Sequence, residues 1–401
     1  MKMKITFTIM LLLSVAFVPA VNAQEENNYS VTSEEAIEHA NAHMIKSITI
    51  DSQFFEKWKG ASIDPKPLEV YDINGKKLYY QFSVYKNNNI IGKIDIGADK
   101  SLGRSVQLVE FDPIPFKTAE AMEKSVEIAK NNYPSGVIES TKPVVYDYPE
   151  IGAMTVVKDK CTGDEHRIFV DAYTIEMVPD KPATETQRGV CSTYEQRLKN
   201  GIDNNLNDWR ESDNLTKSIK QEAINKGINI SVPVSEENIK KFSKNAAMVT
   251  TGFEKYLSVP RYGQEYNNYC AAASGKMISA YYGVTSYTQT QIFNTMGGDP
   301  SGCTLSGQLN FYKSAQSSGG LGKSGSTLVT SGFSFNNAVS EIGYNRPFKS
   351  GTNTHARVCN GYTTVPGNFL SIDDPLPVGS TSGSSYMEAY GSEGNRIYVR
   401  S

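Results

Sequence analysis

Histidine is scarce in this chain, which has four in 401 residues, and only one of them, His355, lies beyond residue 166. No CxxC pair occurs, so neither a zinc site of that kind nor a dithiol redox site is expected. The net charge of −3 gives no basic surface for nucleic acid or for an anionic membrane. After residue 23, no apolar run approaches the roughly 20 residues that a membrane span needs.

The first 23 residues have the pattern of a signal peptide. Lys2 and Lys4 precede an apolar stretch over residues 5–18, and Val21-Asn22-Ala23 fits a small-residue cleavage site. We therefore expect a secreted or cell-surface protein, with an uncleaved amino-terminal anchor as the alternative.

The five cysteines form an odd set, which predicts one unpaired thiol in an exported chain. Cys270 is the candidate for that thiol. The other four could form two disulfides, one before and one after Cys270, or remain thiols; these four are Cys161, Cys191, Cys303 and Cys359.

Residues 24–180 are predicted to form an α+β module. A capping box, with Thr32 as N-cap and Glu35 three residues later, predicts a helix to about residue 47. Strands over 77–85 and 90–96, joined by an asparagine-rich turn, predict a hairpin, and a second helix is expected over 118–132. His39 and His43 share one face of the first helix and are expected to be exposed to solvent.

Residues 181–250 are polar and helix-prone, and we expect a helical linker or activation segment there. Two prolines follow each other closely at its start, within residues 179–188. Proteolytic processing is expected between about 180 and 255.

Cys270 opens a predicted helix that runs to about residue 282 and ends at Gly283. The amides at a helix N-terminus stabilise a thiolate, which is the attacking form of cysteine. An amide carbonyl under attack becomes an oxyanion that needs hydrogen-bond donors. Gln264 precedes the cysteine by six residues and can supply a carboxamide donor, with Asn267 and Asn268 as rivals.

His355 stands at the start of a predicted strand, and a second strand over 369–374 ends in Asp373-Asp374-Pro375. If Tyr362 faces Phe369 in this pair, then His355, Arg357 and Asp374 share one face of the sheet. This register makes Asp374 the residue that orients the imidazole. A slip of one position would select Asp373 instead.

The carboxy-terminal half resembles the papain-like cysteine peptidases, and within them the branch related to bacteriocin-leader peptidases. The strings that carry the resemblance are VPRYGQEYNNYCAAASGKMISAYYG, YTQTQIFNTMGG, EIGYNRPF, HARVCNGY and IDDP. The resemblance implies that Cys270 is the nucleophile, His355 the general base and acid, Asp374 the orienting group and Gln264 the oxyanion donor. Ala271-Ala272 departs from the residues that often follow the family's cysteine, so the resemblance does not predict which residues form the substrate-binding wall.

The amino-terminal half is similar in pattern to the propeptide domains of exported cysteine peptidases such as streptopain, through VYDINGKKLYYQFSVY and NNIIGKIDIGADKSLG. This similarity implies a module that assists folding and blocks the active site until it is removed. A generic substrate-binding module is the alternative for this half.

The predicted fold class is therefore α+β, with a papain-like domain of helix and antiparallel sheet over residues 251–401 behind an α+β propeptide. The predicted function is that of an exported cysteine endopeptidase, made as a proenzyme, without metal or organic cofactor. Its partners would be protein or peptide substrates and its own propeptide, with no nucleic acid and, after signal removal, no membrane. The alternatives are transglutaminase-type acyl transfer and a non-catalytic cell-surface binding module.

Overall fold

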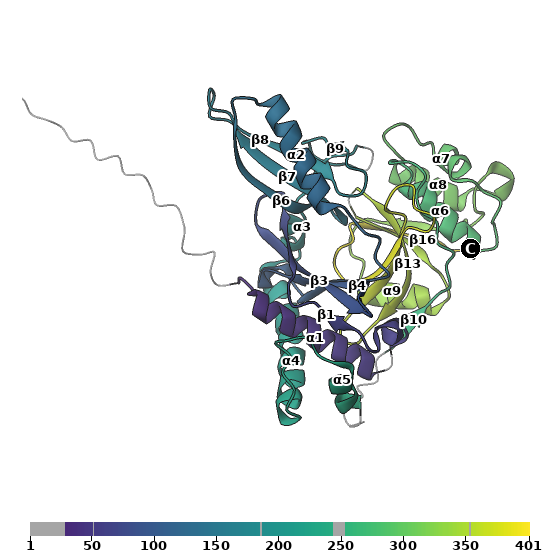
Figure 1. Ribbon diagram of the computed structural model, residues 1–401. Helices are drawn as coiled ribbons and strands as arrows, with labels where there is room; N and C mark the ends of the chain where they lie inside the picture. The colour runs from purple at the N-terminus through teal and green to yellow at the C-terminus, as the bar shows by residue number, and fades with distance from the viewer. Residues whose placement is uncertain (1–28, 51, 185–186, 244–252, 353) are drawn as a thin grey trace, which may run out of the picture.

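The computed structural model describes residues 29–50, 52–184, 187–243, 253–352 and 354–401. The predicted signal peptide lies outside these residues. The chain folds into a mixed structure of helices and one extended sheet, consistent with the expected α+β class (Figure 1). Within the described residues, no helix is both long and apolar enough to cross a bilayer.

The amino-terminal half contains two long helices that the sequence predicted, and both lie close to their expected bounds. The helices of this half and of the segment that follows it are α1 (Ser33–Thr49), α2 (Thr118–Asn132), α3 (Thr193–Leu198), α4 (Ile202–Asn225) and α5 (Glu236–Ser243). Its strands are β1 (Ser62–Ile63), β2 (Leu68–Asp72), β3 (Lys77–Lys86), β4 (Asn89–Gly97), β5 (Val106–Phe111), β6 (Val137–Asp147), β7 (Glu150–Lys158), β8 (Glu165–Asp171) and β9 (Met177–Val178).

The carboxy-terminal half begins with a short strand and then the helix of Cys270. Its helices are α6 (Cys270–Tyr281), α7 (Gln289–Thr295), α8 (Leu305–Lys313) and α9 (Phe335–Gly343). Its strands are β10 (Glu254–Tyr256), β11 (Thr327–Val329), β12 (Phe348–Gly351), β13 (Ala356–Thr363), β14 (Phe369–Asp374), β15 (Ser384–Ala389) and β16 (Asn395–Tyr398).

The two halves share one sheet. Its strand order in the described chain is β11-β16-β12-β13-β14-β15-β5-β4-β3-β2-β6-β7-β8-β9, with β1 and β10 paired at its sides. The junction is the antiparallel pairing of β15 with β5, in which Met387 lies opposite Val109. In Figure 1 the blue strands β3 and β4 accordingly lie beside the yellow carboxy-terminal strands. Backbone hydrogen bonds therefore continue from one half into the other.

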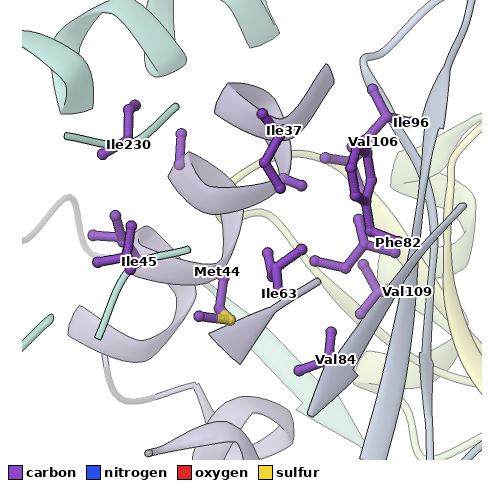
Figure 2. Packing of buried hydrophobic residues seen from close by; sticks show 14 of the residues in the cluster. Ile37, Met44, Ile45, Ile63, Phe82, Val84, Ile96, Val106, Val109 and Ile230 are labelled. Atoms are coloured by element: carbon purple, nitrogen blue, oxygen red, sulfur yellow. The ribbon is translucent and has the colours of Figure 1, made fainter. Parts of the chain in front are cut away.

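Helix α1 packs between this sheet and the helices of the following segment. Ile37 and Met44 point toward the sheet residues Phe82 and Val84, whereas Ile45 lies on the side of Ile230 (Figure 2). Burial of each such side chain contributes roughly 1.5–3 kcal/mol. The residues expected to form a helical linker thus complete the core of the amino-terminal half.

The two histidines of α1 are buried, so the expectation that they face solvent was wrong. His39 Nδ1 and Thr216 Oγ1 form a 2.7 Å hydrogen bond, and the His39 ring packs edge-on against Trp209. His43 packs against Phe369 of the carboxy-terminal half. Burial lowers the pKa of His39 to about 4 and that of His43 to about 3. An isolated helix pattern does not reveal that α1 is covered on both faces.

All five cysteines are free thiols in this structure. The two disulfides considered from the sequence are therefore absent, and the fold relies on packing and hydrogen bonds.

Gly92 allows Trp58 to pack directly against strand β4, and replacing Gly92 tests that packing. A Cβ at Gly92 would lie 2.2 Å from Cζ2 of the fully buried Trp58. We expect Gly92→Ala to lower the free energy of unfolding by about 1–3 kcal/mol, because overpacking forces ring and strand apart. Denaturant titration followed by circular dichroism measures this change.

Gly343→Ala is the matched control, since a Cβ there meets nothing within 4 Å and the residue lies in a helix. Equal stabilities of Gly92→Ala and Gly343→Ala would contradict the packing described for Trp58.

Candidate active site

Cys270 is the first residue of α6, as the sequence predicted. The helix ends where Gly283 adopts a φ of +86°. Its buried face of small side chains packs near β13, where Ser274 Oγ donates a 3.0 Å hydrogen bond to the carbonyl of Ala356. This contact brings the helix N-terminus next to the residue that precedes Ala356, which is His355.

His355 lies in the turn that leads into β13. Its backbone is fixed on both sides by Thr352, because His355 N donates to Thr352 Oγ1 at 3.0 Å and Thr352 N donates to the His355 carbonyl at 2.9 Å. The ring Nε2 lies 2.7 Å from Asp374 Oδ1, and the imidazole is near enough to the Cys270 thiol that each group shifts the pKa of the other. Since Nε2 is held by the carboxylate, Nδ1 is the ring nitrogen that remains for the sulfur.

The three side chains alter one another's acidity in a consistent direction. Burial alone would raise the pKa of Cys270, but the hydrogen bond and charge of His355 outweigh it, so the pKa of the thiol is lowered. Burial would lower the pKa of His355, but Asp374 and Cys270 together raise it to about 10. His355 and Arg357 likewise lower the pKa of Asp374 against its burial. The arrangement favours a thiolate, an imidazolium and a carboxylate in a row.

The pairing of β13 with β14, which places Asp374 near His355, differs from the expected register. Tyr362 pairs with Leu370 rather than with Phe369, so that part of the prediction was wrong. A bulge between Cys359 and Gly361 then shifts the pairing by one residue, and Val358 lies opposite Asp373.

Asp373 lies on the opposite side of β14 from the imidazole. It accepts a 2.6 Å hydrogen bond from Asn360 Nδ2. Burial raises its pKa to about 6. The carboxylate that contacts His355 is therefore that of Asp374.

Gln264 is buried beside Cys270, but its amide is turned toward the backbone. Nε2 donates to the carbonyls of Tyr266 at 3.0 Å and Asn267 at 3.3 Å, while Oε1 has no hydrogen-bond partner. Asn268 Nδ2 donates to the carbonyls of Asp299 and Pro300. An oxyanion donor from either side chain requires one of these N–H groups to rotate toward the sulfur.

The cavity in front of Cys270 has a volume of about 160 Å³ and is lined by both halves of the chain. The carboxy-terminal half contributes the cysteine, the histidine and residues of α6, α8 and β12. The amino-terminal side contributes Asp147, Glu150, Thr184, Gln187 and Arg188.

Asp147 connects the amino-terminal half to the residue next to His355. Its Oδ1 accepts a 2.7 Å hydrogen bond from Thr354 Oγ1, one residue before His355. Burial raises its pKa to about 7, and burial likewise raises the pKa of Glu150. These two carboxyl groups were missed in the sequence because nothing local marks the turn between β6 and β7 as a neighbour of residue 354.

No set of three histidine, cysteine, aspartate or glutamate side chains among the described residues is arranged to hold a metal ion. The side chains around the Cys270 thiol include an imidazole, carboxylates and amides.

Comparison with known proteins gives one family match. Residues 256–395 match the Peptidase_C39 like family. The matched region runs from β10 to the start of β16 and includes Cys270, His355 and Asp374. At the family level it supports a cysteine peptidase of the C39 or papain-like kind. A search of curated proteins gives no match.

Replacing each of the two neighbouring aspartates separates their contributions. Asp374→Asn removes the charge that raises the pKa of His355, so the thiolate of Cys270 loses its counter-ion. We expect the rate of Cys270 alkylation by iodoacetamide at pH 6 to fall at least about tenfold, since one pKa unit is a factor of ten. Mass spectrometry of the modified peptide measures the rate.

Asp373→Asn is the control, because Asp373 contacts Asn360 and not the imidazole. We expect its alkylation rate to stay near that of the wild type. A larger loss in Asp373→Asn than in Asp374→Asn would contradict the assignment.

Proposed function

We propose that this chain is an exported cysteine endopeptidase made as a proenzyme. The observation that carries the proposal is that Cys270 and His355 line one cavity, with Asp374 hydrogen-bonded to the far side of the imidazole, within the region that matches a peptidase family. A lowered thiol pKa beside a raised imidazole pKa is the combination that a cysteine nucleophile requires.

In the proposed reaction, the Cys270 thiolate attacks the carbonyl carbon of a peptide bond, and the electron pair of the C=O bond moves to oxygen. The backbone N–H of Cys270 and a reoriented amide of Gln264 are the donors that we assign to this oxyanion. His355 then donates its proton to the leaving amine as the C–N bond breaks, which leaves an acyl-thioester. His355 removes a proton from water in the second half of the reaction, and hydrolysis of the thioester restores the thiolate.

The proenzyme part of the proposal is supported by the shared cavity. Asp147 and Glu150 of the amino-terminal half, and Arg188 of the segment that follows it, line the space in front of Cys270. Two carboxyl groups line the cavity that a substrate would enter, and the charge of His355 lowers the pKa of both, against the larger effect of their burial. We therefore assign the amino-terminal half the role of a propeptide that restricts access to an already assembled site.

The sulfur of Cys270 provides the direct test of both parts. Cys270→Ala should abolish cleavage of a denatured protein substrate and any conversion of the purified chain to a shorter form. Cys161→Ala, at an exposed position, should retain both activities. Electrophoresis with sequencing of the new amino terminus follows the conversion.

Three results would contradict parts of this proposal. A shortened form in purified Cys270→Ala assigns processing to another protease. Cross-linked products without cleavage assign the chain to acyl transfer to amines. A wild-type Cys270 that resists alkylation at neutral pH favours a binding module.

The pH dependence of hydrolysis reports the charge of His355. Its pKa is raised from 6.5 to about 10, so the proton it donates to the leaving amine is present at neutral pH and is lost as the pH rises toward 10. The same proton stabilises the fold fully below pH 6.5, and this contribution also disappears toward pH 10. We expect kcat to hold between pH 7 and 9 and to fall near pH 10, with circular dichroism as the check on folding. A fall already centred near pH 6.5 would contradict the ion pair.

A further inference from the structure

Arg357 is a fully buried arginine in the strand that follows His355. A guanidinium removed from water costs several kcal/mol unless it is paired. Its partner is Glu388 of β15, also fully buried, whose two oxygens accept from Nη1 at 2.7 Å and from Nη2 at 3.1 Å. The cost of placing this ion pair in the core is offset only by close hydrogen bonds, which makes its position in the fold precise.

The ion pair contacts the catalytic carboxylate through a single hydroxyl. Arg357 Nη1 donates a 3.0 Å hydrogen bond to the hydroxyl oxygen of Tyr386, and the Tyr386 hydroxyl lies 2.7 Å from Asp374 Oδ2. Arginine has donors only, so the tyrosine oxygen must accept from it. The one proton of the hydroxyl is then directed at Asp374.

Every oxygen of Asp374 is consequently occupied. Oδ1 accepts from His355 Nε2 at 2.7 Å and from the backbone N–H of Leu376 at 2.9 Å, while Oδ2 accepts from Tyr386. Three donors around a planar group fix both its position and its rotation. Loss of the donor at Oδ2 would free the carboxylate to turn away from the imidazole.

We propose that Tyr386 is a positioning residue for Asp374, itself held in place by the Arg357–Glu388 ion pair. This inference rests on the proposed function. The Tyr386 hydroxyl is hydrogen-bonded to Arg357 and Asp374, so we assign its effect to the carboxylate. Its hydroxyl stabilises the ionised form of Asp374 and keeps Oδ1 directed at Nε2.

The same ion pair connects the site to the amino-terminal half. Tyr148, which follows β6, donates a 3.0 Å hydrogen bond from its hydroxyl to Glu388 Oε2. Glu388 lies in the stretch of β15 that pairs with β5. The network that positions Asp374 is therefore completed at the junction of the two halves.

Tyr386→Phe tests the inference, because it removes the donor and keeps the ring. We expect kcat to fall about tenfold or more with little change in KM, which is the effect of losing a hydrogen bond to a charged group. We also expect the acid limb of the Cys270 alkylation profile to move to higher pH. Without its third donor, Asp374 takes up a proton at higher pH, and the imidazolium and thiolate are lost with it.

Tyr390→Phe is the matched control. Tyr390 follows β15, and its hydroxyl donates to the carbonyl of Phe333 at 2.8 Å, away from Asp374. We expect the pH profile of this variant to match that of the wild type. A purely structural role for Tyr386 would lower the unfolding temperature without moving the acid limb, and that result would overturn the inference.

A second variant keeps the test decisive if Tyr386→Phe does not fold. Site-specific 3-fluorotyrosine at position 386 retains the hydroxyl and makes it a stronger donor, so the acid limb should move to lower pH. An unchanged limb in this variant, with a reactive wild type, would overturn the inference. If Cys270 of the wild type is inert, the proposed function itself has failed.

Discussion

The arrangement depends on one buried carboxylate. Asp374 is about 1% exposed, and a charge in such a place persists only when donors and cations surround it. His355, the Leu376 amide and Tyr386 provide the donors, and Arg357 adds a positive charge within reach. Because Asp374 stays ionised, His355 is held as a cation, and the thiol of Cys270 becomes acidic. The acidity of the Cys270 thiol thus depends on Asp374, which acts through His355.

The junction between the halves also contributes to the surroundings of the site. The pairing of β15 with β5 and the bond from Tyr148 to Glu388 connect the carboxy-terminal half to the amino-terminal half. Asp147 and Glu150, on either side of the turn between β6 and β7, line the same cavity as Cys270.

The sequence predicted features that depend on local pattern. The helix beginning at Cys270, the hairpin of β3 and β4, and helix α2 lie at or near their expected positions. Helices α7 and α9 were not predicted, although the sequence contains a local signal for each. Their capping boxes, at Thr288 and Ser334, indicate the start of a helix. The register of β13 and β14 could not be predicted from the local pattern, because the bulge after Cys359 shifts the pairing by one residue.

Contacts between distant segments could not be predicted. Arg357 interrupts an apolar strand, which marks it as unusual, but its partners Glu388 and Tyr386 lie some 30 residues away on a strand that the sequence did not predict. The burial of His39 and His43 depends on helices packed over α1, and the position of Asp147 depends on how two halves of the chain meet. In each case a long-range contact sets the environment of a titratable group.

The protonation state of His355 in the full-length chain is the most direct test of the central claim. Only four histidines are present, so nitrogen-15 labelling gives four imidazoles to follow, and the signal of His355 is assigned by its loss in His355→Ala. The structure predicts that this ring is still an imidazolium at pH 8, because Asp374 and Cys270 raise its pKa to about 10. A neutral His355 imidazole at pH 8 would contradict the ion pair and the reactivity built on it.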